Sequence, residues 1–379
     1  MPLASHHEQI RDAVRRFARE RLAPNAARWD REKHFPREEV AALAAMGLCG
    51  VTIPEDHGGA GMDNTALALA CEEISAGDGA TCTIIMVNNL VAHILNGYGS
   101  AAQKKEFLAP LAKGAQLGAF CLTEPQAGSD ASAITTRAER SGSQYVLNGV
   151  KQFITSGKTA RIAVVFAVTD KTAGKKGISA FVVPTSTPGY AVARIEDKTG
   201  QRASDTAQIL LENCAVPAAN LLAQEGLGYR IALANLESGR INVAAQATGM
   251  ARAALEAALA YAGERKSMGK TLLEHQAVNF RLADMATAVE ASRQLYLHAA
   301  ALRDKGTPCL KEASMAKLFA SEAAEKVCSD AIQIHGGYGY VTDFPVERIW
   351  RDVRVCQIYE GASDIQRLVI GRALAPGQS

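Results

Sequence analysis

The stretch "RIAVVFAVTD" (161–170) lies near the middle of the 379-residue sequence and is the first of several short runs rich in β-branched residues. Each run is bounded by Gly, Pro, Ser, Thr or Asp, and this spacing is typical of antiparallel β-structure in a small barrel or sandwich. The later runs are "GISAFVVPT" (177–185), "YAVARIED" (190–197) and "TAQILLENCAVP" (206–217). The sequence therefore predicts a β-domain in the middle of the chain.

Helical patterns lie on both sides of this β-domain. Residues 7–24, "HEQIRDAVRRFARERLAP", place their apolar side chains on one helical face, and Pro24 is expected to end that helix. After the β-domain the helices are longer, and one of them is expected to close at Gly336. Another has one buried face, formed by apolar residues spaced four, three and four apart: Val278, Leu282, Met285 and Val289.

The order of these elements defines the fold class. Helices, then strands, then helices, without βαβ alternation, indicate an α+β fold. We expect an N-terminal helical domain over residues 1–118, a central antiparallel β-barrel-like domain over 119–226 and a C-terminal four-helix bundle over 227–379. The length of the chain also favours two or three domains over a single core.

Composition excludes several classes of protein. Hydrophobic residues make up 48% of the chain, charged residues make up 21%, and the formal net charge is +2. This balance argues against a nucleic-acid binder and against a polybasic membrane protein. The eight cysteines are scattered without a CxxC pair, which favours free thiols in a reducing compartment over disulfides or a zinc site. We expect no metal.

The start of the sequence bears on location. The first residues, "MPLASHHEQIRDAVRRF", contain no apolar core of a signal peptide, and Glu8 and Asp12 argue against a transit peptide. No apolar run is expected to reach the ~18 residues that a membrane span needs, so no membrane insertion is expected. We predict a cytoplasmic protein of bacterial type, or a mitochondrial matrix protein if the chain is a processed eukaryotic form.

Several short motifs fail on spacing or context. "GERKSMGKT" (263–271) has five residues between its glycines where a P-loop needs four, and it lies in sequence expected to be helical. "GGYG" (336–339) follows a helix, whereas a dinucleotide fingerprint follows a strand. "AGSDA" (127–131) is not a nucleophile elbow, and HExxH is absent from the sequence. Nucleoside triphosphatase, Rossmann dehydrogenase, serine hydrolase and metalloprotease functions are therefore disfavoured.

The segments that remain carry clustered hydroxyls, glycines and charges. Taken singly, each has an ordinary structural explanation such as a turn, a hairpin, an ion pair or a helix cap. "LESGR" (236–240), for example, is expected to begin a helix with an acid and an arginine. The others are "FCLTEPQAGSD" (120–130), "NGVKQFITSG" (148–157), "ERKSMGKTLLEHQ" (264–276), "QIHGGYGY" (333–340) and "IYEGASDIQR" (358–367).

In this order and spacing, these segments resemble the acyl-CoA dehydrogenase family over essentially the whole chain. The similarity is greatest to the short-chain and short-branched-chain members. The resemblance implies FAD-dependent α,β-dehydrogenation of short straight or branched acyl-CoA thioesters to trans-2-enoyl-CoA, in fatty acid β-oxidation or branched-chain amino acid degradation. It further implies electron-transfer flavoprotein as acceptor and a homotetramer, a dimer of dimers, whose FAD sites are shared between subunits.

Two other functions fit the same fold. An acyl-CoA oxidase would use oxygen as acceptor, but oxidases of this kind usually carry an additional C-terminal domain, and the chain ends soon after "IYEGASDIQR". A non-catalytic interaction protein of the same fold would not need a complete set of flavin segments. Both remain alternatives to the dehydrogenase.

Glu360 is the candidate catalytic residue. Ser363 and Gln366 have the spacing of a capping box, which places Glu360 in the turn before a helix. Its ordinary interpretation is an exposed carboxylate. The resemblance makes it the base that removes the substrate α-proton, which requires that burial raise its pKa towards neutrality. Some family members instead place the base at the position of Gly239, which leaves Glu360 as the candidate here.

The resemblance also assigns binding residues. Glu237 and Arg240 are expected on the substrate side, although an i, i+3 ion pair between them is an equally good explanation. Phe153, Met268 and Ala362 depart from the Trp, Phe and Thr common in the family. The expected substrate-binding residues are Ser129, Glu237, Arg240, Tyr359 and Gly361. One set of expected FAD-binding residues is Phe120, Cys121, Leu122, Thr123, Ser129, Phe153, Ile154, Thr155, Ala362 and Asp364. A second set is Arg265, Met268, Gln276, Gln333, Ile334, His335, Gly336 and Gly337. Within the second set, the segments of Arg265, Gln276 and 333–337 are expected to reach the FAD of a neighbouring subunit.

Overall fold

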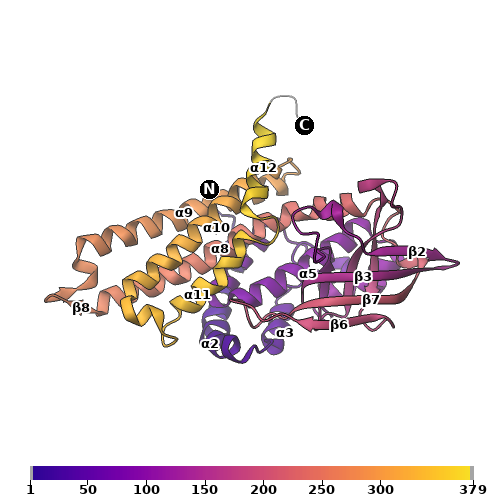
Figure 1. Ribbon diagram of the computed structural model, residues 1–379. Coiled ribbons are helices and arrows are strands. Elements are labelled where there is room, and N and C mark those ends of the chain that lie inside the picture. The colour runs from indigo at the N-terminus through magenta and orange to yellow at the C-terminus, as the bar shows by residue number, and fades with distance from the viewer. Residues whose placement is uncertain (1–2, 376–379) are drawn as a thin grey trace.

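The computed structural model describes residues 3–375, and its sheet lies at one side of the molecule, with the N-terminal helices beside it and the long C-terminal helices extending away from it (Figure 1). Helices occupy the chain up to Ala112, strands occupy residues 118–217, and long helices follow from Gly228. This arrangement confirms the predicted α+β class with an N-terminal helical, a central β and a C-terminal helical part.

The N-terminal part consists of short helices around one long pair. The helices are α1 (Ser5–Phe17), α2 (Ala23–Glu32), α3 (Arg37–Ala45), α4 (Asn64–Gly77), α5 (Gly79–Tyr98), α6 (Ala101–Gln103) and α7 (Ala109–Ala112). The prediction that Pro24 ends the first helix is wrong. A π-helical turn (Ala18–Leu22) joins α1 to α2, and Pro24 lies in the first turn of α2, where a missing N–H removes no helical hydrogen bond.

Helix α5 corrects a second expectation. Gly79–Tyr98 is long and apolar enough to cross a membrane by length and composition, so the expectation that no segment reaches this length is wrong. However, 83% of its most apolar window is buried inside the protein. Asp78 caps the helix by accepting a hydrogen bond from the Thr81 N–H at 2.8 Å. We therefore assign α5 as a core helix, and it forms one wall of the cavity described below.

The central part is one seven-stranded sheet. Its strands are β1 (Gly118–Cys121), β2 (Arg137–Ser141), β3 (Gln144–Thr155), β4 (Ile162–Val168), β5 (Ile178–Pro184), β6 (Tyr190–Ile195) and β7 (Thr206–Pro217). The order is β1-β4-β2-β3-β7-β6, with β5 paired to β4. Most pairs are antiparallel, as predicted, but β1 and β2 both run parallel to β4.

The C-terminal part is dominated by three long helices. Its elements are α8 (Gly228–Glu264), a hairpin of β8 (Lys266–Ser267) and β9 (Lys270–Thr271), α9 (Gln276–Asp304), α10 (Leu310–His335), α11 (Val346–Val353) and α12 (Ser363–Leu374). Leu282, Met285 and Val289 are buried as predicted, and Gly336 ends α10 with φ +61°. Two expectations are wrong: "LESGR" lies inside α8 instead of starting a helix, and residues 266–271 form a hairpin instead of a helix.

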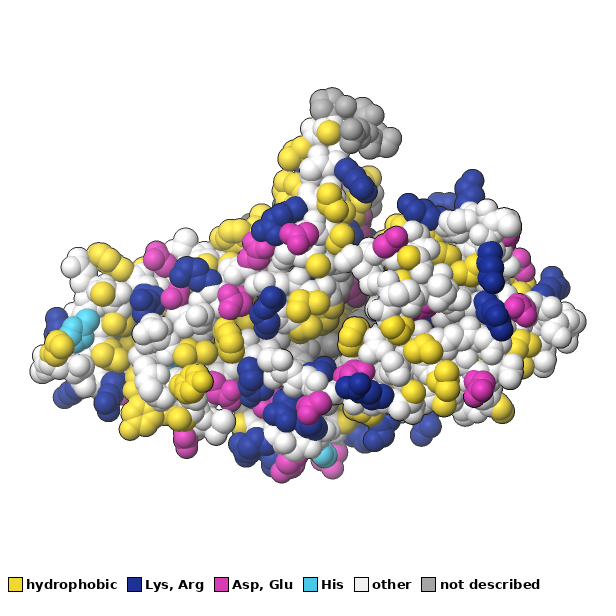
Figure 2. All heavy atoms as spheres, viewed as in Figure 1, with side chains coloured by type: hydrophobic (Ala, Val, Ile, Leu, Met, Phe, Trp, Pro, Cys, Tyr) yellow, Lys and Arg dark blue, Asp and Glu magenta, His cyan; other side chains and the backbone are white. Residues whose placement is uncertain are grey.

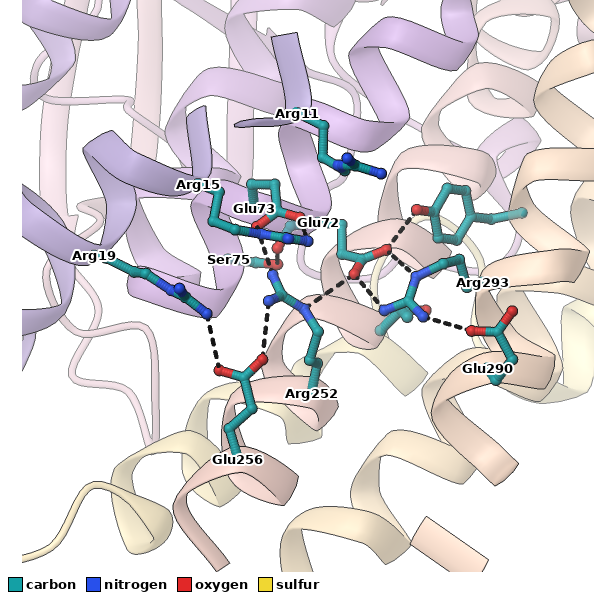
Figure 3. Close-up of polar contacts among 12 residues, drawn as sticks. Arg11, Arg15, Arg19, Glu72, Glu73, Ser75, Arg252, Glu256, Glu290 and Arg293 are labelled. Carbon is teal, nitrogen blue, oxygen red and sulfur yellow. Dashed lines mark hydrogen bonds and ion pairs between the residues drawn. The ribbon is translucent and has the colours of Figure 1, made fainter. Parts of the chain in front are cut away.

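A buried ion network joins the N-terminal and C-terminal helices (Figure 3). Glu72 and Glu73 are neighbours on α4, and each is only 2% exposed. Arg252 of α8 lies 3.1 Å from Glu72 and 2.6 Å from Glu73, and Arg293 of α9 lies 2.7 Å from Glu72. Arg15 of α1 also pairs with Glu73 at 2.8 Å, and two adjacent carboxylates are stable at this depth because these three arginines compensate them. The network therefore fixes α4 against α8 and α9.

Replacing Arg252 with Met should destabilise the protein strongly, because Arg252 pairs with both buried carboxylates and its loss leaves each of them with one arginine, Arg293 for Glu72 and Arg15 for Glu73. We expect a loss of about 3–5 kcal/mol in the free energy of unfolding, measured by chemical denaturation at fixed protein concentration. Arg281→Met is the control, since Arg281 forms a more exposed pair with Asp330 at 3.5 Å and should cost less than about 1 kcal/mol. Equal losses in the two variants would contradict this account of the network.

Candidate active site

One cavity lies where the three parts of the chain meet. It has a volume of about 250 Å³ and is lined from α5, from the sheet, from α8 and from the turn that precedes α12. Met86 and Leu90 form part of the α5 wall, and Leu233 and Leu236 form part of the α8 wall. Glu360 lies in the lining. The cavity therefore combines an apolar surface with one acidic group.

Backbone contacts hold the turn that carries Glu360. Glu360 has φ +54° and Gly361 has φ +89°, so two successive residues have left-handed backbone conformations. Gln366 Nε2 donates hydrogen bonds to the carbonyls of Glu360 at 3.1 Å and Gly361 at 2.8 Å. Helix α12 begins at Ser363 as predicted, but the predicted capping box is wrong, because the Gln366 side chain binds these carbonyls instead. The strained turn directs the Glu360 side chain into the cavity.

The Glu360 carboxyl is tuned by burial and by two cations. Burial raises its pKa to about 7, although the charges of Arg240 and Lys317 oppose that rise. Its Oε2 atom is buried and has no hydrogen-bond partner in the described part of the chain. The interpretation of Glu360 as an exposed surface carboxylate is therefore wrong. A group with this pKa can both hold and release a proton near neutrality.

Gly239 provides the space that Glu360 occupies. A Cβ atom at position 239 would lie 2.5 Å from Glu360 Oε2 and 2.8 Å from its Cδ, distances at which atoms clash. A side chain at 239 and the observed position of Glu360 exclude each other. The absence of a side chain at 239 is thus a steric requirement of this site.

Arg240 is buried beside the carboxylate without an ion-pair partner. It is 6% exposed, and its Nε and Nη1 atoms have no hydrogen-bond partner among residues 3–375. The alternative ion pair between Glu237 and Arg240 is wrong, because Glu237 pairs with Arg303 of α9 at 2.9 Å. Glu237 also lies outside the cavity lining, whereas Arg240 is part of it. Arg240 is thus available to an anionic or carbonyl group in the cavity.

The predicted flavin residues of the sheet gather on the opposite wall. Thr123, Ser129 and Thr155 line the cavity, and within residues 3–375 their hydroxyls form no hydrogen bond. A bulge in β3 at Lys151 to Ile154 gives Phe153 a φ of +59°, and its side chain lines the cavity while it is 63% exposed. The other predicted residues in the lining are Phe120, Leu122 and Ile154. Unpaired hydroxyls beside aromatic and aliphatic side chains fit a flat, polar-edged ring such as a flavin.

Cys121 and Asp364 lie apart from this wall. Cys121 is fully buried within the core of the sheet and is absent from the cavity lining. Asp364 is exposed in the first turn of α12, and Ala362 precedes that turn. Tyr359 and Gly361, in contrast, both line the cavity, and the Tyr359 hydroxyl donates a hydrogen bond to Gln246.

The sequence did not predict the ion pair between Lys151 and Glu124, which holds the segment that follows β1 beside the cavity. Lys151 of β3 is fully buried, and its Nζ donates to Glu124 at 2.8 Å and to the Leu122 carbonyl at 3.1 Å. Glu124 in turn accepts hydrogen bonds from the N–H groups of Thr135 and Thr136. Both charged residues lie within the quoted segments "TEP" and "NGVK", but only the fold reveals that they pair.

The remaining predicted FAD residues form a second group at the far end of α8. Arg265 and four consecutive residues of the α10 terminus, 334–337, line a separate cleft. At 1.5 Å rise per residue, Arg265 lies about 37 Å along α8 from Arg240. The two groups of predicted FAD residues therefore line separate places in the chain.

Individual side chains at this far end differ in exposure. His335 is buried and stacks on Tyr261 at 4.3 Å between ring centroids, at the base of the cleft that it lines. Met268 is 92% exposed at the tip of the hairpin. Gln276 and Gln333 are also exposed. These exposed residues are free to contact a neighbouring molecule.

One group of metal-ligating residue types meets near the N-terminus. His6, His7 and Asp63 place one ligand atom each within 4.8 Å of one another. His7 Nε2 lies 2.9 Å from both carboxylate oxygens of Asp63, which also caps α4 through the N–H of Ala66. These contacts give the group a structural role, fastening α1 to α4.

Comparison with known proteins assigns the class. Models of the N-terminal, middle and C-terminal domains of acyl-CoA dehydrogenases match residues 4–115, 119–214 and 226–375. These domains define flavoprotein oxidoreductases that act on CH–CH bonds and use FAD. The chain belongs to the acyl-CoA dehydrogenase family.

Relatives are similar over their whole length. The chain is 46% identical to an acyl-CoA dehydrogenase of Bacillus subtilis (strain 168) over 378 residues, covering 100% of both. It is 46% identical to the mitochondrial short-chain specific acyl-CoA dehydrogenase of Rattus norvegicus over 369 residues, covering 97% of this chain and 90% of the relative. The structure of butyryl-CoA dehydrogenase from Megasphaera elsdenii is similar with a TM-score of 0.97 at 40% identity, covering 99% of each chain.

Replacing Gly239 with Ala should displace Glu360, because the added methyl group overlaps its carboxylate. We expect turnover to fall roughly a hundredfold, the cost of a displacement of about 1 Å in a catalytic group. Gly263→Ala is the matched control in the same helix, since a Cβ atom there meets nothing within 4 Å. Steady-state assays of both variants test this, and wild-type turnover in Gly239→Ala would contradict the steric requirement.

Proposed function

We propose that this acyl-CoA dehydrogenase acts on short straight or branched acyl-CoA thioesters and that Glu360 is its catalytic base. The observation that carries the proposal is a carboxyl group with a pKa of about 7 and an unpartnered oxygen, held in the cavity by a strained turn. A thioester α-proton is only weakly acidic, so a base near neutral pKa is needed to remove it.

The proposed reaction breaks one C–H bond at the α-carbon and one at the β-carbon of the acyl group. Glu360 takes the α-hydrogen as a proton, and the electron pair of that bond forms the new C=C bond. The β-hydrogen would leave with its electron pair, and FAD held at the Thr123, Ser129 and Thr155 wall would supply the hydride acceptor, since no side chain can take a hydride. Arg240 supplies positive charge beside the site where negative charge develops on the thioester.

Binding roles follow from the two walls of the cavity. We assign Thr123, Ser129 and Thr155 to hydrogen bonding with the flavin, and Phe120 and Phe153 to packing against it. Tyr359 and Gly361 border the substrate position. We assign the FAD contacts of Cys121 and Asp364 to their backbone or to positions outside this cavity. Glu237 acts through its ion pair with Arg303 and not by direct substrate contact.

The choice of a short acyl group rests on two observations. The cavity is small, at about 250 Å³, and its helical walls carry the bulky side chains of Met86, Leu90 and Leu236. The similar proteins named above include short-chain and butyryl-CoA dehydrogenases. Both straight and branched short chains fit this description, as do roles in β-oxidation and in branched-chain amino acid degradation.

The electron acceptor and assembly are part of the same proposal. We propose electron-transfer flavoprotein as acceptor and a homotetramer in which Arg265, Gln276 and residues 333–337 of one subunit serve the FAD of its neighbour. The separation of about 37 Å along α8 supports this sharing. The cytoplasmic location expected from the sequence stays a prediction.

We expect the purified protein to be yellow and its long-wavelength flavin band to bleach when butyryl-CoA is added under nitrogen. Glu360→Gln keeps the shape of the side chain but removes the base, so turnover should fall ~10²–10⁴-fold while FAD and acyl-CoA still bind. Dye-coupled rates across straight and branched acyl-CoAs then rank the substrates.

Three outcomes would overturn parts of this proposal. An unchanged flavin spectrum with every acyl-CoA from butyryl to palmitoyl would exclude the dehydrogenase reaction. A Glu360→Gln variant that kept more than about a tenth of the wild-type rate would exclude Glu360 as base. Stoichiometric peroxide formation in air would favour the oxidase.

Subunit sharing predicts complementation. Arg265→Ala should weaken FAD binding roughly ten- to a hundredfold, because a charged hydrogen-bond donor is worth about 1.5–3 kcal/mol. When Arg265→Ala and Glu360→Gln subunits are co-expressed with different tags, some mixed sites contain an intact glutamate from one chain and an intact arginine from the other. Activity should therefore reappear in purified hybrids. Hybrids as inactive as both parents would place Arg265 and Glu360 in the same subunit's site.

A further inference from the structure

A fully buried lysine lies directly behind the Glu360 turn. Lys317 is in the middle of α10 and is 0% exposed. Its Nζ donates a hydrogen bond to the Gly361 carbonyl at 2.7 Å, and within residues 3–375 it forms no other hydrogen bond or ion pair. Burying an ammonium group with a single neutral partner is costly, so this position needs an explanation.

Three charged groups from three separate elements converge here. Arg240 of α8, Lys317 of α10 and Glu360 of the turn interact electrostatically, although neither cation forms a direct ion pair with the carboxylate. Lys317 also faces Cys356 and, more weakly, Glu322. Two cations against one carboxylate leave an excess of positive charge in a buried region, where charge interactions are strong.

The uncharged side chain of Gln366 already holds the Glu360 turn by hydrogen bonds. Gln366 of α12 is 0% exposed and donates to the same Gly361 carbonyl at 2.8 Å, and to the Glu360 carbonyl at 3.1 Å. The Gly361 carbonyl therefore does not need Lys317 in order to be satisfied. What Lys317 adds beyond Gln366 is a positive charge close to the catalytic carboxyl.

We propose that Lys317 is a positioning residue for catalysis: it braces the Glu360 turn through the Gly361 carbonyl and keeps the Glu360 carboxylate ionised, and therefore basic, at physiological pH. Burial alone favours the protonated carboxylic acid, which is inactive as a base. The charge of Lys317 opposes this effect from behind the turn, where it does not occupy the cavity. The inference rests on the proposed role of Glu360.

Lys317 and Gln366 both donate a hydrogen bond to the Gly361 carbonyl, so variants of the two residues separate the effect of charge from the effect of hydrogen bonding. Lys317→Met removes both the hydrogen bond and the charge, whereas Gln366→Met removes hydrogen bonds alone. The acid limb of the pH profile is the region in which kcat/KM falls as Glu360 becomes protonated. Lys317→Met should move this limb to a pH higher by about one unit or more, because loss of a nearby opposite charge raises the pKa of a carboxyl. Its kcat at pH 7 should fall about tenfold or more, with little change in KM. Gln366→Met should lower kcat without moving the limb.

Controls and a second readout complete the test. Lys326→Met, on the exposed side of α10, should change neither kcat nor the limb, because Lys326 pairs only with Asp330. Lys317→Arg should keep the limb near its wild-type position, and Lys317→Gln replaces Lys317→Met if that variant does not fold. Difference infrared spectroscopy, with Glu360→Gln as reference, should titrate the Glu360 carboxyl at higher pH in the neutral variants than in wild type.

The outcomes separate this inference from the proposed function. An acid limb and a carboxyl titration unchanged in the neutral Lys317 variants would overturn the role of its charge, as would an equal shift in Gln366→Met. In either case an inactive Glu360→Gln variant would still support Glu360 as the base. Retained activity in Glu360→Gln would instead overturn the proposed function itself.

Discussion

The contact of Arg252 with the adjacent carboxylates of Glu72 and Glu73 is the constraint on which the active site depends. Buried carboxylates without compensation would separate the helices or take up protons, so α4 and α8 have one favourable relative position. That position sets α5, which follows α4 after Asp78, opposite the α8 residues around Arg240. The walls of the cavity thus follow from an electrostatic network that lies outside the cavity and takes no part in the chemistry (Figure 3).

The catalytic carboxyl is held by a different kind of constraint. Glu360 is neither in a helix nor in a strand, and its positive φ costs roughly 1–3 kcal/mol that surrounding contacts must offset. Lys317 and Gln366 provide those contacts from two helices, and Gly239 on a third leaves the space for the side chain. The glutamate is therefore positioned by residues that are far apart in sequence, and its basicity depends on the balance between burial and the cations around it.

This division explains what could be predicted from the sequence. The order of helices and strands is a local property, because it follows from periodicity and turn residues, and it was predicted correctly. Glu360 was identified because its segment is distinctive. Two features depend on tertiary contacts that residue spacing does not encode. One is the bonding of Gln366 to the Glu360 and Gly361 carbonyls instead of a capping box with Ser363, and the other is the buried pair of Lys151 with Glu124. The prediction that Pro24 ends the first helix is wrong because the π-helical turn at Ala18–Leu22 places Pro24 in the first turn of α2.

The length of α8 links the chemistry to assembly. Its N-terminal half borders the Glu360 cavity, while its end leads to Arg265 and to a hairpin whose Met268 is almost fully exposed. Hydrophobic side chains are exposed on the same end, including Phe280 and Tyr340, and Figure 2 shows others along the projecting α12. Exposed apolar surface of this kind marks contact with another molecule. Because the two groups of predicted FAD residues lie near opposite ends of the continuous helix α8, the proposed sharing lets a neighbouring subunit complete each cofactor site.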